Sequence, residues 1–379
     1  MKVLSIGTDK KLFEKESPVR ARIIEHGTLF NELHIIVFTL AKQKFVSEKI
    51  SDNVWIYPTN SLSRFLYPFS ARALFKKELS EFAPDVITTQ DPFETGLAGW
   101  LINRKVHTKL HVQIHTDFLS SYFTHNSFLN IVRVRIARWL LPKADAVRAV
   151  SLRVKQSLSA IDPKLPERTV VLPIYSDLSA FKNISKTVDL HKKYPQFSHI
   201  ILMASRFTPE KNIGLALSVL RDVIVRFQNV GLIIVGEGPE KRYLQGLVLR
   251  YHLDRNVVFE PWQQQLAAYY ASADIFFTTS LYEGYGLTLL EAAVSGCPIV
   301  SSDVGIASTV IEGGKNGFIS TKIDKNNFVT LLLSILEKPE LYASLKDHAK
   351  QYAEQKMAEP KTHYLEAYKH MLESTAIAP

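Results

Sequence analysis

Short apolar runs alternate with longer amphipathic segments along the whole chain, and this alternation predicts the fold. The first half contains β-rich runs at Val3–Gly7, His34–Phe38, Val54–Tyr57, Asp85–Thr89, Leu110–His115, Ala146–Val150 and Thr169–Leu172. The second half contains further runs at Ile200–Ala204, Gly231–Val235, Val257–Phe259, Ile275–Thr278, Pro298–Ser301 and Gly317–Ile319. Strands that alternate with helical patterns indicate βαβ units and parallel sheets. The pattern therefore predicts an α/β protein with two doubly wound, Rossmann-like domains.

A polar stretch near Asp177–Pro195 separates the two series of runs. We place the first domain at residues 1–183 together with 360–379, and the second at residues 184–359. The last two helical patterns, Pro339–Gln355 and Lys361–Glu373, flank Pro360. Proline disfavours helix continuation, so the final helix can turn there and pack elsewhere. In parallel sheets ligands bind beyond the carboxyl ends of the strands, so two such domains would hold their ligands in a cleft between them.

Composition removes several classes of protein. The 379 residues are 46% hydrophobic and 22% charged, which is typical of a soluble globular chain. No apolar run approaches the ~18 residues of a membrane-spanning helix, and the short apolar N-terminus precedes its charges, unlike a signal peptide. The single cysteine, Cys297, excludes a disulfide framework or a cysteine metal cluster and is consistent with a reducing cytosol. We therefore expect a cytoplasmic protein.

The positive charge is confined to one half of the chain. Residues 1–185 carry the entire net charge of +9, because they contain 26 Lys+Arg and 17 Asp+Glu. This asymmetry favours an acidic partner for that half: a phosphorylated acceptor, an anionic membrane surface or nucleic acid. Two stretches, 63–77 and 128–141, mix this charge with bulky apolar residues. Each reads either as an ordinary surface helix with its apolar stripe on the core or as a membrane-surface helix.

The most informative segment is Ser280–Ala292, which follows an apolar run and opens a helix. Gly284 and Gly286 permit a close backbone approach to a ligand. The amides around Gly286–Leu289 would form a helix N-terminus, which suits a phosphate. Glu283 on the loop and Glu291 inside the helix could bind separate hydroxyl groups of one long ligand. The alternative is a glycine-rich turn with a solvated Glu291.

A second segment, Ala204–Asn212, also joins a strand to a helix. Its Arg206 and Lys211 could converge on one anion, the first as a bidentate donor and the second as a movable point charge. The alternative is a surface loop with solvated cations. The turn at Gly236 is similar, but it lacks the spacing of a P-loop or a dinucleotide fingerprint. Kinase, NTPase and simple dehydrogenase functions are therefore weakly supported.

Histidines and the first helix complete the candidates. His111 and His115 fall on the same side of the run Leu110–His115, with His115 at its carboxyl end, although a lone histidine is more often structural. No grouping of His, Asp and Glu has convincing metal-ligand spacing, so we expect no protein-bound catalytic metal. Ser17-Pro18 is typical of a helix N-cap followed by proline at the first helical position.

Taken together, these segments resemble the family 4 glycosyltransferases, retaining nucleotide-sugar enzymes of the two-domain GT-B fold. The resemblance rests on Glu283 and Glu291 within Glu-Gly-Tyr-Gly-Leu-Thr-Leu-Leu-Glu-Ala, on Ser-Arg-Phe-Thr-Pro-Glu-Lys-Asn at 205–212 and on Val-Gly-Glu-Gly-Pro-Glu at 235–240. It also includes the strand that ends at His115. It covers nearly all of residues 198–319 and is diffuse over 1–180.

The resemblance implies a role for each matching position. Arg206 and Lys211 would neutralise the donor diphosphate, and His115 would contact the sugar or its reacting centre. Glu283 would contact the transferred sugar, and Glu291 would hold the ribose hydroxyls. The remaining positions implied in donor binding are Gly236, Phe259, Glu260, Gly284, Tyr285, Gly286, Leu287 and Thr288, with Phe259 and Glu260 edging the nucleobase through their backbone. The last helix would cross back onto the first domain.

Two segments depart from the family pattern. The usual glycine-rich loop after the first strand is replaced by residues 7–17, which keep only Gly7. The common Gly-Gly-x-x-Glu turn reads Gly305-Ile306-Ala307-Ser308-Thr309 here.

The leading hypothesis is a metal-independent transferase that moves a sugar from a UDP- or GDP-linked donor to a cell-envelope glycan or lipid-linked acceptor. Its basic half would contact the inner face of the membrane. The enzymatic alternative is an epimerase or phosphorylase of the same fold. The non-enzymatic alternative is a module that binds anionic membrane or nucleic acid. The nucleic-acid version is disfavoured because the aromatic residues mostly fall at apolar-face spacing rather than as an exposed stacking stripe.

Overall fold

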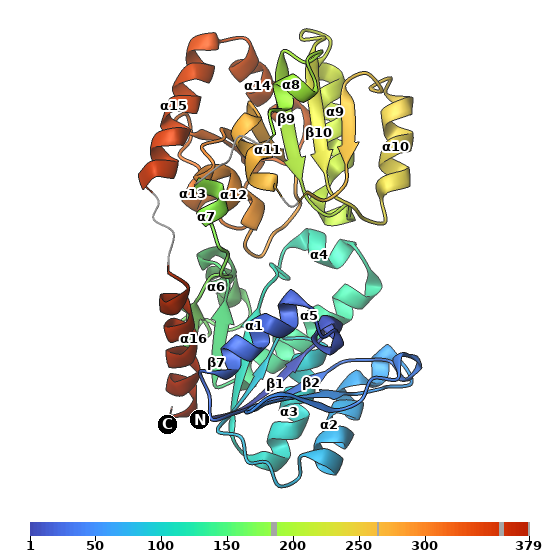
Figure 1. The fold of residues 1–379 in the computed structure, drawn as a ribbon, viewed down its shortest axis with the longest axis vertical. Coiled ribbons are helices and arrows are strands. Elements are labelled where there is room, and N and C mark those ends of the chain that lie inside the picture. Colours follow the sequence, from blue (N-terminus) through green and yellow to red (C-terminus); the bar gives the residue numbers. More distant parts are fainter. Residues whose placement is uncertain (183–187, 264, 356–359, 378–379) are drawn as a thin grey trace. The chain divides into compact units, whose positions relative to one another are not determined.

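The computed structural model describes residues 1–379 apart from 183–187, 264, 356–359 and 378–379. The chain divides into two compact units (Figure 1). Unit 1 comprises Met1–Tyr175 with Glu359–Pro379, and unit 2 comprises Ser176–Ala358. The boundary expected at 183/184 falls on residues outside the described part, and the one expected at 359/360 falls where the described part resumes.

Unit 1 is built on an eight-stranded sheet of order β3-β4-β2-β1-β5-β6-β7-β8. Its strands are β1 (Lys2–Gly7), β2 (Glu32–Val37), β3 (Glu48–Ser51), β4 (Val54–Pro58), β5 (Val86–Thr89), β6 (Lys109–Ile114), β7 (Ala146–Ala149) and β8 (Thr169–Val171). Its helices are α1 (Pro18–Gly27), α2 (Tyr67–Glu78), α3 (Glu94–Val106), α4 (Ser121–His125), α5 (Phe128–Leu140), α6 (Leu152–Ser157) and α16 (Lys361–Ala376). All strand pairs are parallel except that of β3 with β4.

Helices cover both faces of this sheet. On one face α16 contacts β5 and β6, and its Tyr368, Met371 and Leu372 join the buried cluster beneath α1. On the other face α3 contacts β1, β5 and β6 and packs between α2 and α5. The last helix of the chain therefore completes unit 1, as the resemblance implied.

Unit 2 is built on a six-stranded parallel sheet of order β11-β10-β9-β12-β13-β14. Its strands are β9 (His199–Ala204), β10 (Val230–Val235), β11 (Val257–Glu260), β12 (Ile275–Thr278), β13 (Ile299–Ser302) and β14 (Gly317–Ser320). Its helices are α7 (Ser179–Lys182), α8 (Leu190–Lys193), α9 (Ile213–Val223), α10 (Lys241–Arg250), α11 (Leu266–Ser272), α12 (Leu287–Val294), α13 (Ala307–Val310), α14 (Lys325–Leu336) and α15 (Pro339–Gln355).

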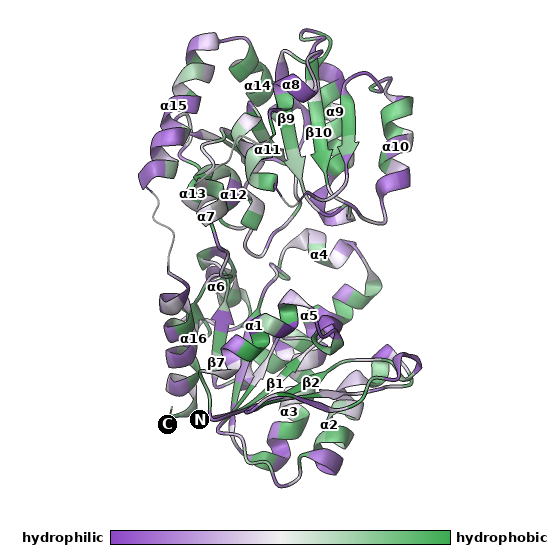
Figure 2. Ribbon diagram, viewed as in Figure 1, coloured by the Kyte–Doolittle hydropathy of each residue, from purple (hydrophilic) through white to green (hydrophobic). Residues whose placement is uncertain are grey.

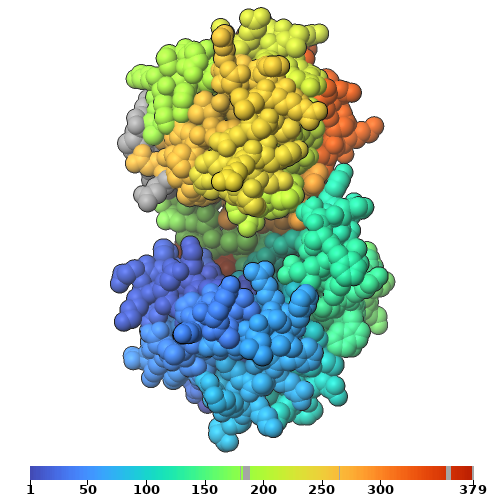
Figure 3. Space-filling model, turned by 90° about the vertical axis from the view of Figure 1, so that its right-hand side faces the viewer, coloured from blue at the N-terminus to red at the C-terminus, as the bar shows by residue number. Residues whose placement is uncertain are grey.

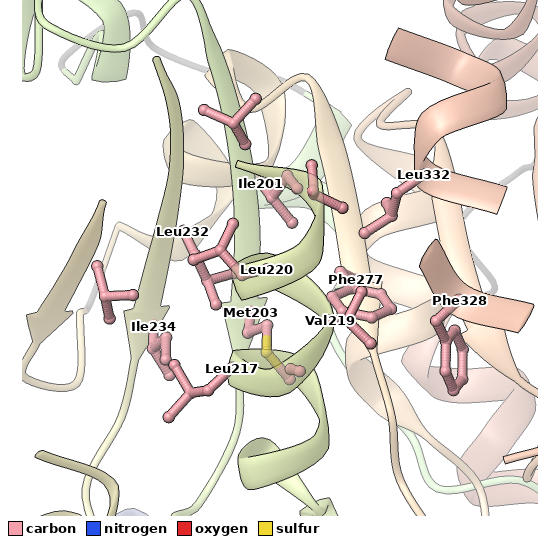
Figure 4. Close-up of a cluster of buried hydrophobic side chains, with 14 of the residues drawn as sticks. Ile201, Met203, Leu217, Val219, Leu220, Leu232, Ile234, Phe277, Phe328 and Leu332 are labelled. Carbon is pink, nitrogen blue, oxygen red and sulfur yellow. The ribbon is translucent and has the colours of Figure 1, made fainter. Parts of the chain in front are cut away.

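The strands of unit 2 are mostly apolar because both faces of the sheet are buried. Alternate residues of β9 serve opposite cores: Ile201 and Met203 face α9 and α14, whereas Ile200 and Leu202 face α11 and α12. The first cluster is drawn in Figure 4, where side chains of β9, β10 and β12 meet those of α9 and α14. The hydropathy colouring in Figure 2 shows β9 and β10 as hydrophobic along most of their length.

The elements expected from the sequence are present, most with ends within two residues of the expected positions. The Ser17 hydroxyl caps α1 by accepting from the Val19 amide at 3.2 Å, with Pro18 at the first helical position. The helix Pro339–Gln355 has the expected bounds, and the last helix continues three residues beyond Glu373 to Ala376. The edge strand β3 was not expected, and its sequence Glu-Lys-Ile-Ser carries little apolar signal.

Candidate functional site

The strand order of unit 2 locates the edge where a ligand is expected. β10 and β11 lie on one side of β9, and β12 to β14 lie on the other, so the direction of winding changes between β9 and β12. Ligands of open α/β sheets bind outside the carboxyl ends of the strands at such a point. The loop after β9 and the loop after β12 meet there, since the Leu281 amide donates to the Glu210 carbonyl at 2.8 Å.

Lys211 and Glu283 form an ion pair at this point, through Lys211 Nζ and Glu283 Oε1. The Ser280 hydroxyl donates to the same carboxylate oxygen at 2.9 Å. The two charged side chains are only 15% and 17% exposed. The structure thus brings together the lysine expected to bind an anion and the glutamate expected to bind a sugar, although they lie 72 positions apart in the sequence.

Arg206 lies apart from this pair. Its side chain is 76% exposed, and its Nη2 is 3.7 Å from Glu210 Oε1. The neighbouring Phe207 is fully buried and packs edge-on against Phe259, with ring centroids 5.8 Å apart. Phe207 thus packs in the core, whereas the side chain of Arg206 is largely in solvent, and the expected convergence of Arg206 with Lys211 is not seen.

Two glycines allow the loops at this edge to pack backbone against backbone. Gly236 follows β10 with φ of 144°, and a Cβ there would lie 1.9 Å from the Ser205 carbonyl oxygen. Gly305 follows β13 with φ of 53°, and its Cβ would lie 2.2 Å from the Tyr285 carbonyl oxygen. That carbonyl accepts the Ile306 amide at 2.9 Å. The turn at Gly305, which departs from the family pattern, therefore still packs on the loop after β12.

The helix α12 begins directly after this loop. Its N-cap is Gly286, with φ of 90° and no side chain to cap the first amides, which belong to Leu287 and Thr288. Those amides carry the partial positive charge of a helix N-terminus. Gly284 and Tyr285 complete the loop between Glu283 and the helix.

Glu291 lies in the second turn of α12 and is largely buried. Tyr270 Oη donates to its Oε2 at 3.0 Å. Burial raises the pKa of Glu291, and the hydrogen bond from Tyr270 opposes that rise. A freely solvated Glu291, the alternative left open by the sequence, does not describe this side chain.

Glu260, at the end of β11, is 6% exposed and holds neighbouring elements together. Its carboxylate accepts from Lys193 Nζ at 2.7 Å, from Tyr269 Oη at 2.5 Å and from Tyr194 Oη. Burial alone would raise the pKa of Glu260, but these hydrogen bonds together outweigh burial and lower it. The side chain of Glu260 is thus committed to contacts inside unit 2.

His115 and His111 belong to unit 1. His115 follows β6 and lines a cavity of about 180 Å³ with Arg148 and Lys361. Burial, together with the nearby Arg148 cation, lowers the pKa of His115 to about 4. His111 is fully buried, and its Nδ1 is hydrogen-bonded to the Thr88 hydroxyl at 2.9 Å. His111 is therefore structural, and His115 is neutral at pH 7.

A roomier cavity of unit 2, about 630 Å³, lies at the opposite edge of its sheet. Its lining includes Phe197, Asn229 and Asn256, which precede β9, β10 and β11. Those are the amino ends of parallel strands, where the fold does not place ligands. We therefore assign the site to the Lys211 and Glu283 edge.

The described residues also lack two kinds of feature. No three His, Cys, Asp or Glu side chains among them are grouped so that they could hold a metal ion. None of the helices in the same part of the chain combines the length and the apolar composition needed to cross a membrane.

Comparison with known protein families shows the family to which the chain belongs. The sequence profile described as glycosyl transferases group 1 matches residues 189–352, and the profile described as glycosyltransferase family 4 matches residues 31–178. The chain belongs to the family 4 glycosyltransferases.

Relatives of this glycosyltransferase span most of its length. It is 23% identical to N-acetyl-alpha-D-glucosaminyl L-malate synthase of Bacillus anthracis over 329 residues, which cover 84% of each chain. It is also 23% identical to the alpha-monoglucosyldiacylglycerol synthase of Acholeplasma laidlawii over 347 residues, which cover 85% of this chain and 84% of that one.

Solved structures show that the glycosyltransferase has the GT-B fold. Anabaena HepE in complex with UDP matches with a TM-score of 0.73 and 19% identity, covering 99% of this chain and 100% of that one. Sucrose-phosphate synthase of Thermosynechococcus elongatus matches with a TM-score of 0.78 and 16% identity, with complete coverage of both chains.

Sequence reasoning missed the buried residues that support these sites. Arg148 is 3% exposed inside unit 1, and Tyr270 holds Glu291 in unit 2. The signal available for Arg148 was an arginine within the otherwise apolar run Ala146–Val150. Its significance appears only when α16, more than 200 positions away, packs over it.

Proposed function

We propose that this glycosyltransferase moves a sugar from a nucleotide-sugar donor, with retention of anomeric configuration, to a cell-envelope glycan or lipid-linked acceptor. Structures of Anabaena HepE hold UDP or UDP-glucose, which supports a nucleotide-sugar donor. The names of two relatives, a diacylglycerol glucoside synthase and a malate glycoside synthase, support an acceptor that is lipid-linked or acidic.

The observation that carries the proposal is the Lys211 and Glu283 pair beside the start of α12, at the switch point of the unit 2 sheet. A lysine, a carboxylate and a row of helix amides together offer groups for the two ends of a sugar diphosphate. The cation and the amides suit the diphosphate, and the carboxylate suits sugar hydroxyls.

The same groups explain how the leaving group would depart. When the glycosidic bond to the diphosphate breaks, negative charge grows on the diphosphate oxygens. The amides at Leu287 and Thr288 are fixed in the fold, so they stabilise that charge without reorganising, and Lys211 Nζ joins them once Glu283 releases it. Arg206, at the exposed rim of the loop, adds a mobile cation. This arrangement supports a reaction that does not need a protein-bound metal.

The other assignments follow the family pattern. Glu283 would release Lys211 to the diphosphate and bind the transferred sugar, while Glu291, held by Tyr270, would bind the ribose hydroxyls. Gly236, Phe259 and Glu260 would approach the nucleotide through their backbone. His115, neutral at pH 7, would contact the sugar or its reacting centre.

A panel of UDP- and GDP-linked sugars tests the proposal. We expect Lys211→Ala and Glu283→Ala each to lower kcat/KM for the accepted donor by roughly 100-fold, which is typical of losing one preorganised charge-stabilising group. Arg206→Ala should cost less, about tenfold, because its charge is screened by solvent. Lys315→Ala, which removes an exposed lysine paired with Glu312 in the same unit, is the matched control.

Unchanged turnover in both Lys211→Ala and Glu283→Ala would overturn the assignment of this site. If the protein converts the donor into an epimeric nucleotide sugar without an acceptor, the protein is an epimerase and the transferase assignment is wrong. EDTA should leave the rate unchanged, and a loss of rate that Mg²⁺ restores would contradict metal-independent catalysis.

We also propose that unit 1 contacts the inner, cytoplasmic face of the membrane. Leu62, Phe65 and Phe69 are 87%, 81% and 56% exposed; Arg64 lies among them in the sequence, and Arg72 follows Phe69 by three positions. We refer to these five residues as the basic apolar patch. Apolar side chains interspersed with cations fit a surface of anionic lipids.

A further inference from the structure

A basic pocket lies inside unit 1, whereas the Lys211 and Glu283 edge belongs to unit 2. Its volume is about 180 Å³, enough for a phosphate group with a few waters, since one water occupies about 30 Å³ of liquid. Five parts of unit 1 line it: α1, α16, β7, the carboxyl end of β6 and the segment that follows β8. The lining residues are Arg22, His26, His115, Arg148, Ile174, Tyr175, Lys361 and Tyr364.

Arg148 is the buried member of this lining, with an exposure of 3%. Its Nε donates to the Leu172 carbonyl at 3.0 Å, and its Nη1 donates to Gln113 Oε1 at 2.8 Å. Its Nη2 donates to the Pro173 carbonyl at 2.8 Å and to Tyr364 Oη at 3.1 Å. Four of the five guanidinium N–H groups are thus satisfied by neutral oxygens, and one N–H on Nη1 is left over.

The charge of Arg148 has no carboxylate partner among the described residues, because each of its acceptors is neutral. A buried charge is costly unless an opposite charge or several hydrogen bonds compensate it. The hydrogen bonds and the rings of Tyr364 and Tyr368, 5.8 and 5.6 Å from the guanidinium carbon, compensate in part. A bound anion would complete the compensation.

The other charged groups of the lining add to the positive potential. Arg22 is exposed on α1, and Lys361 pairs with Glu25 at the edge of the pocket. Burial lowers the pKa of His26 and of His115 to about 4, so both are neutral at pH 7. Three cations and one carboxylate leave a net charge of about +2, which matches a phosphate monoester near pH 7.

A purely structural role for Arg148 accounts for only part of this arrangement. Arg148 does fix α16 to the sheet through Tyr364. That role requires neither a cavity beside the guanidinium nor the two further cations, Arg22 and Lys361, that line it.

We propose that this pocket binds a phosphate group carried by the acceptor, with Arg22, Arg148 and Lys361 as its ligands. The acceptor part of the inference rests on the proposed function, because His115, which lines the pocket, is the residue expected near the reacting sugar. Neutral histidines donate or accept hydrogen bonds without adding repulsive or attractive charge.

The test titrates full-length protein with inorganic phosphate, glycerol 3-phosphate or glycerol at constant ionic strength. The ring signals of His26 and His115, assigned by single His→Gln replacements, report on the pocket by NMR. We expect saturable shifts with both phosphates and none with glycerol. In Arg22→Gln/Lys361→Gln the affinity should fall at least about tenfold, since two charge-assisted contacts are lost. Both substitutions are at positions open to solvent, so the variant should fold.

Two controls separate this site from the donor site. Arg135→Gln removes an exposed arginine of α5 in the same unit and should leave the shifts unchanged. Lys211→Ala should also leave them unchanged, whatever it does to donor turnover. If phosphate shifts the histidine signals but the protein turns over none of the donors, the proposed function is wrong and the anion site still stands.

Three outcomes would overturn the inference. The first is no saturable shift of His26 or His115 with either phosphate. The second is equal affinity in wild type and in Arg22→Gln/Lys361→Gln. The third is a saturable shift with inorganic phosphate but none with glycerol 3-phosphate. That result would show that the pocket binds a free anion and does not bind the acceptor.

Discussion

His111 illustrates at the scale of one residue how burial fixes a protonation state. It lies within β6 with no exposed surface, and its single hydrogen-bond partner, Thr88, is neutral. Burial, followed by the Arg148 charge, lowers its pKa to about 3. The unfolded chain would protonate this ring near pH 6.5, whereas the folded protein does not.

This difference predicts an acid-sensitive unit 1. Between about pH 6.5 and pH 3 the unfolded state binds a proton that the folded state excludes, so stability is lost as pH falls through that window. His111→Gln should remove up to ~1.4 kcal/mol per pH unit of that dependence. Urea unfolding at pH 7, 6 and 5 measures it.

His363→Gln, which replaces an exposed histidine of α16, is the control for the pH dependence. Equal slopes of unfolding free energy against pH in wild type and His111→Gln would contradict the prediction, even if the variant is less stable overall.

At the scale of elements, the Lys211 and Glu283 edge depends on loops that touch through their backbones. The loop after β10 approaches the loop after β9 so closely that only glycine fits at 236. The loop after β9 carries Lys211, so the position of the lysine depends on the close backbone fit at Gly236.

Gly236→Ala should therefore impair the site and the fold together. The added Cβ would meet the Ser205 carbonyl, and relief of that contact must move the backbone that leads to Lys211. We expect a loss of about 1–3 kcal/mol in the free energy of unfolding and a rise in KM for the donor. Thermal unfolding and donor kinetics measure the two effects.

Gly246→Ala is the matched control. Gly246 lies on α10, whose outer side forms part of the surface turned toward the viewer in Figure 3 (yellow), and a Cβ there has nothing within 4 Å. Alanine in a helix interior should stabilise by up to about 1 kcal/mol without changing kinetics. A normal donor KM in Gly236→Ala would show that the loop contact does not position Lys211.

At the scale of the whole molecule, charge and exposed apolar surface are unevenly distributed. The N-terminal half carries the entire net charge of +9. The basic apolar patch, on and before α2 (light blue in Figure 3), lies in the same half. Exposed phenylalanines usually mark an interaction surface when they cluster, rather than isolated surface residues.

This distribution predicts binding to anionic vesicles. Full-length protein should co-sediment with phosphatidylglycerol vesicles at low salt, less at high salt and little with phosphatidylcholine. Phe65→Ser/Phe69→Ser should lower the bound fraction several-fold, because each buried aromatic side chain contributes more than 1 kcal/mol. Val225→Ser, at a 78% exposed position of unit 2, is the control. If wild type, Phe65→Ser/Phe69→Ser and Val225→Ser bind the vesicles equally, the basic apolar patch does not contact the membrane.

Much of the fold and part of the site could be predicted from the sequence. The apolar strands of both sheets were evident because strands buried on two faces have almost no polar positions. The edge strand β3 was not evident, since an edge strand needs few apolar residues and Glu48 is committed to an ion pair with Arg20. Lys211, Glu283 and Glu291 were singled out as candidates because their segments join a strand to a helix, whereas the exposure of Arg206 became evident only from the structure.

The sequence by itself determined the two series of strands and helices, the confinement of charge to one half and the position of the loops at strand ends, because local periodicity and composition are properties of neighbouring residues. Only the tertiary structure decided that Lys211 meets Glu283, that Glu260 is committed to Lys193 and two tyrosines, and that Arg148 lies beside a pocket under α16. These are contacts between segments tens to hundreds of positions apart. Burial and sheet order set them, and neither is contained in any one stretch of the chain.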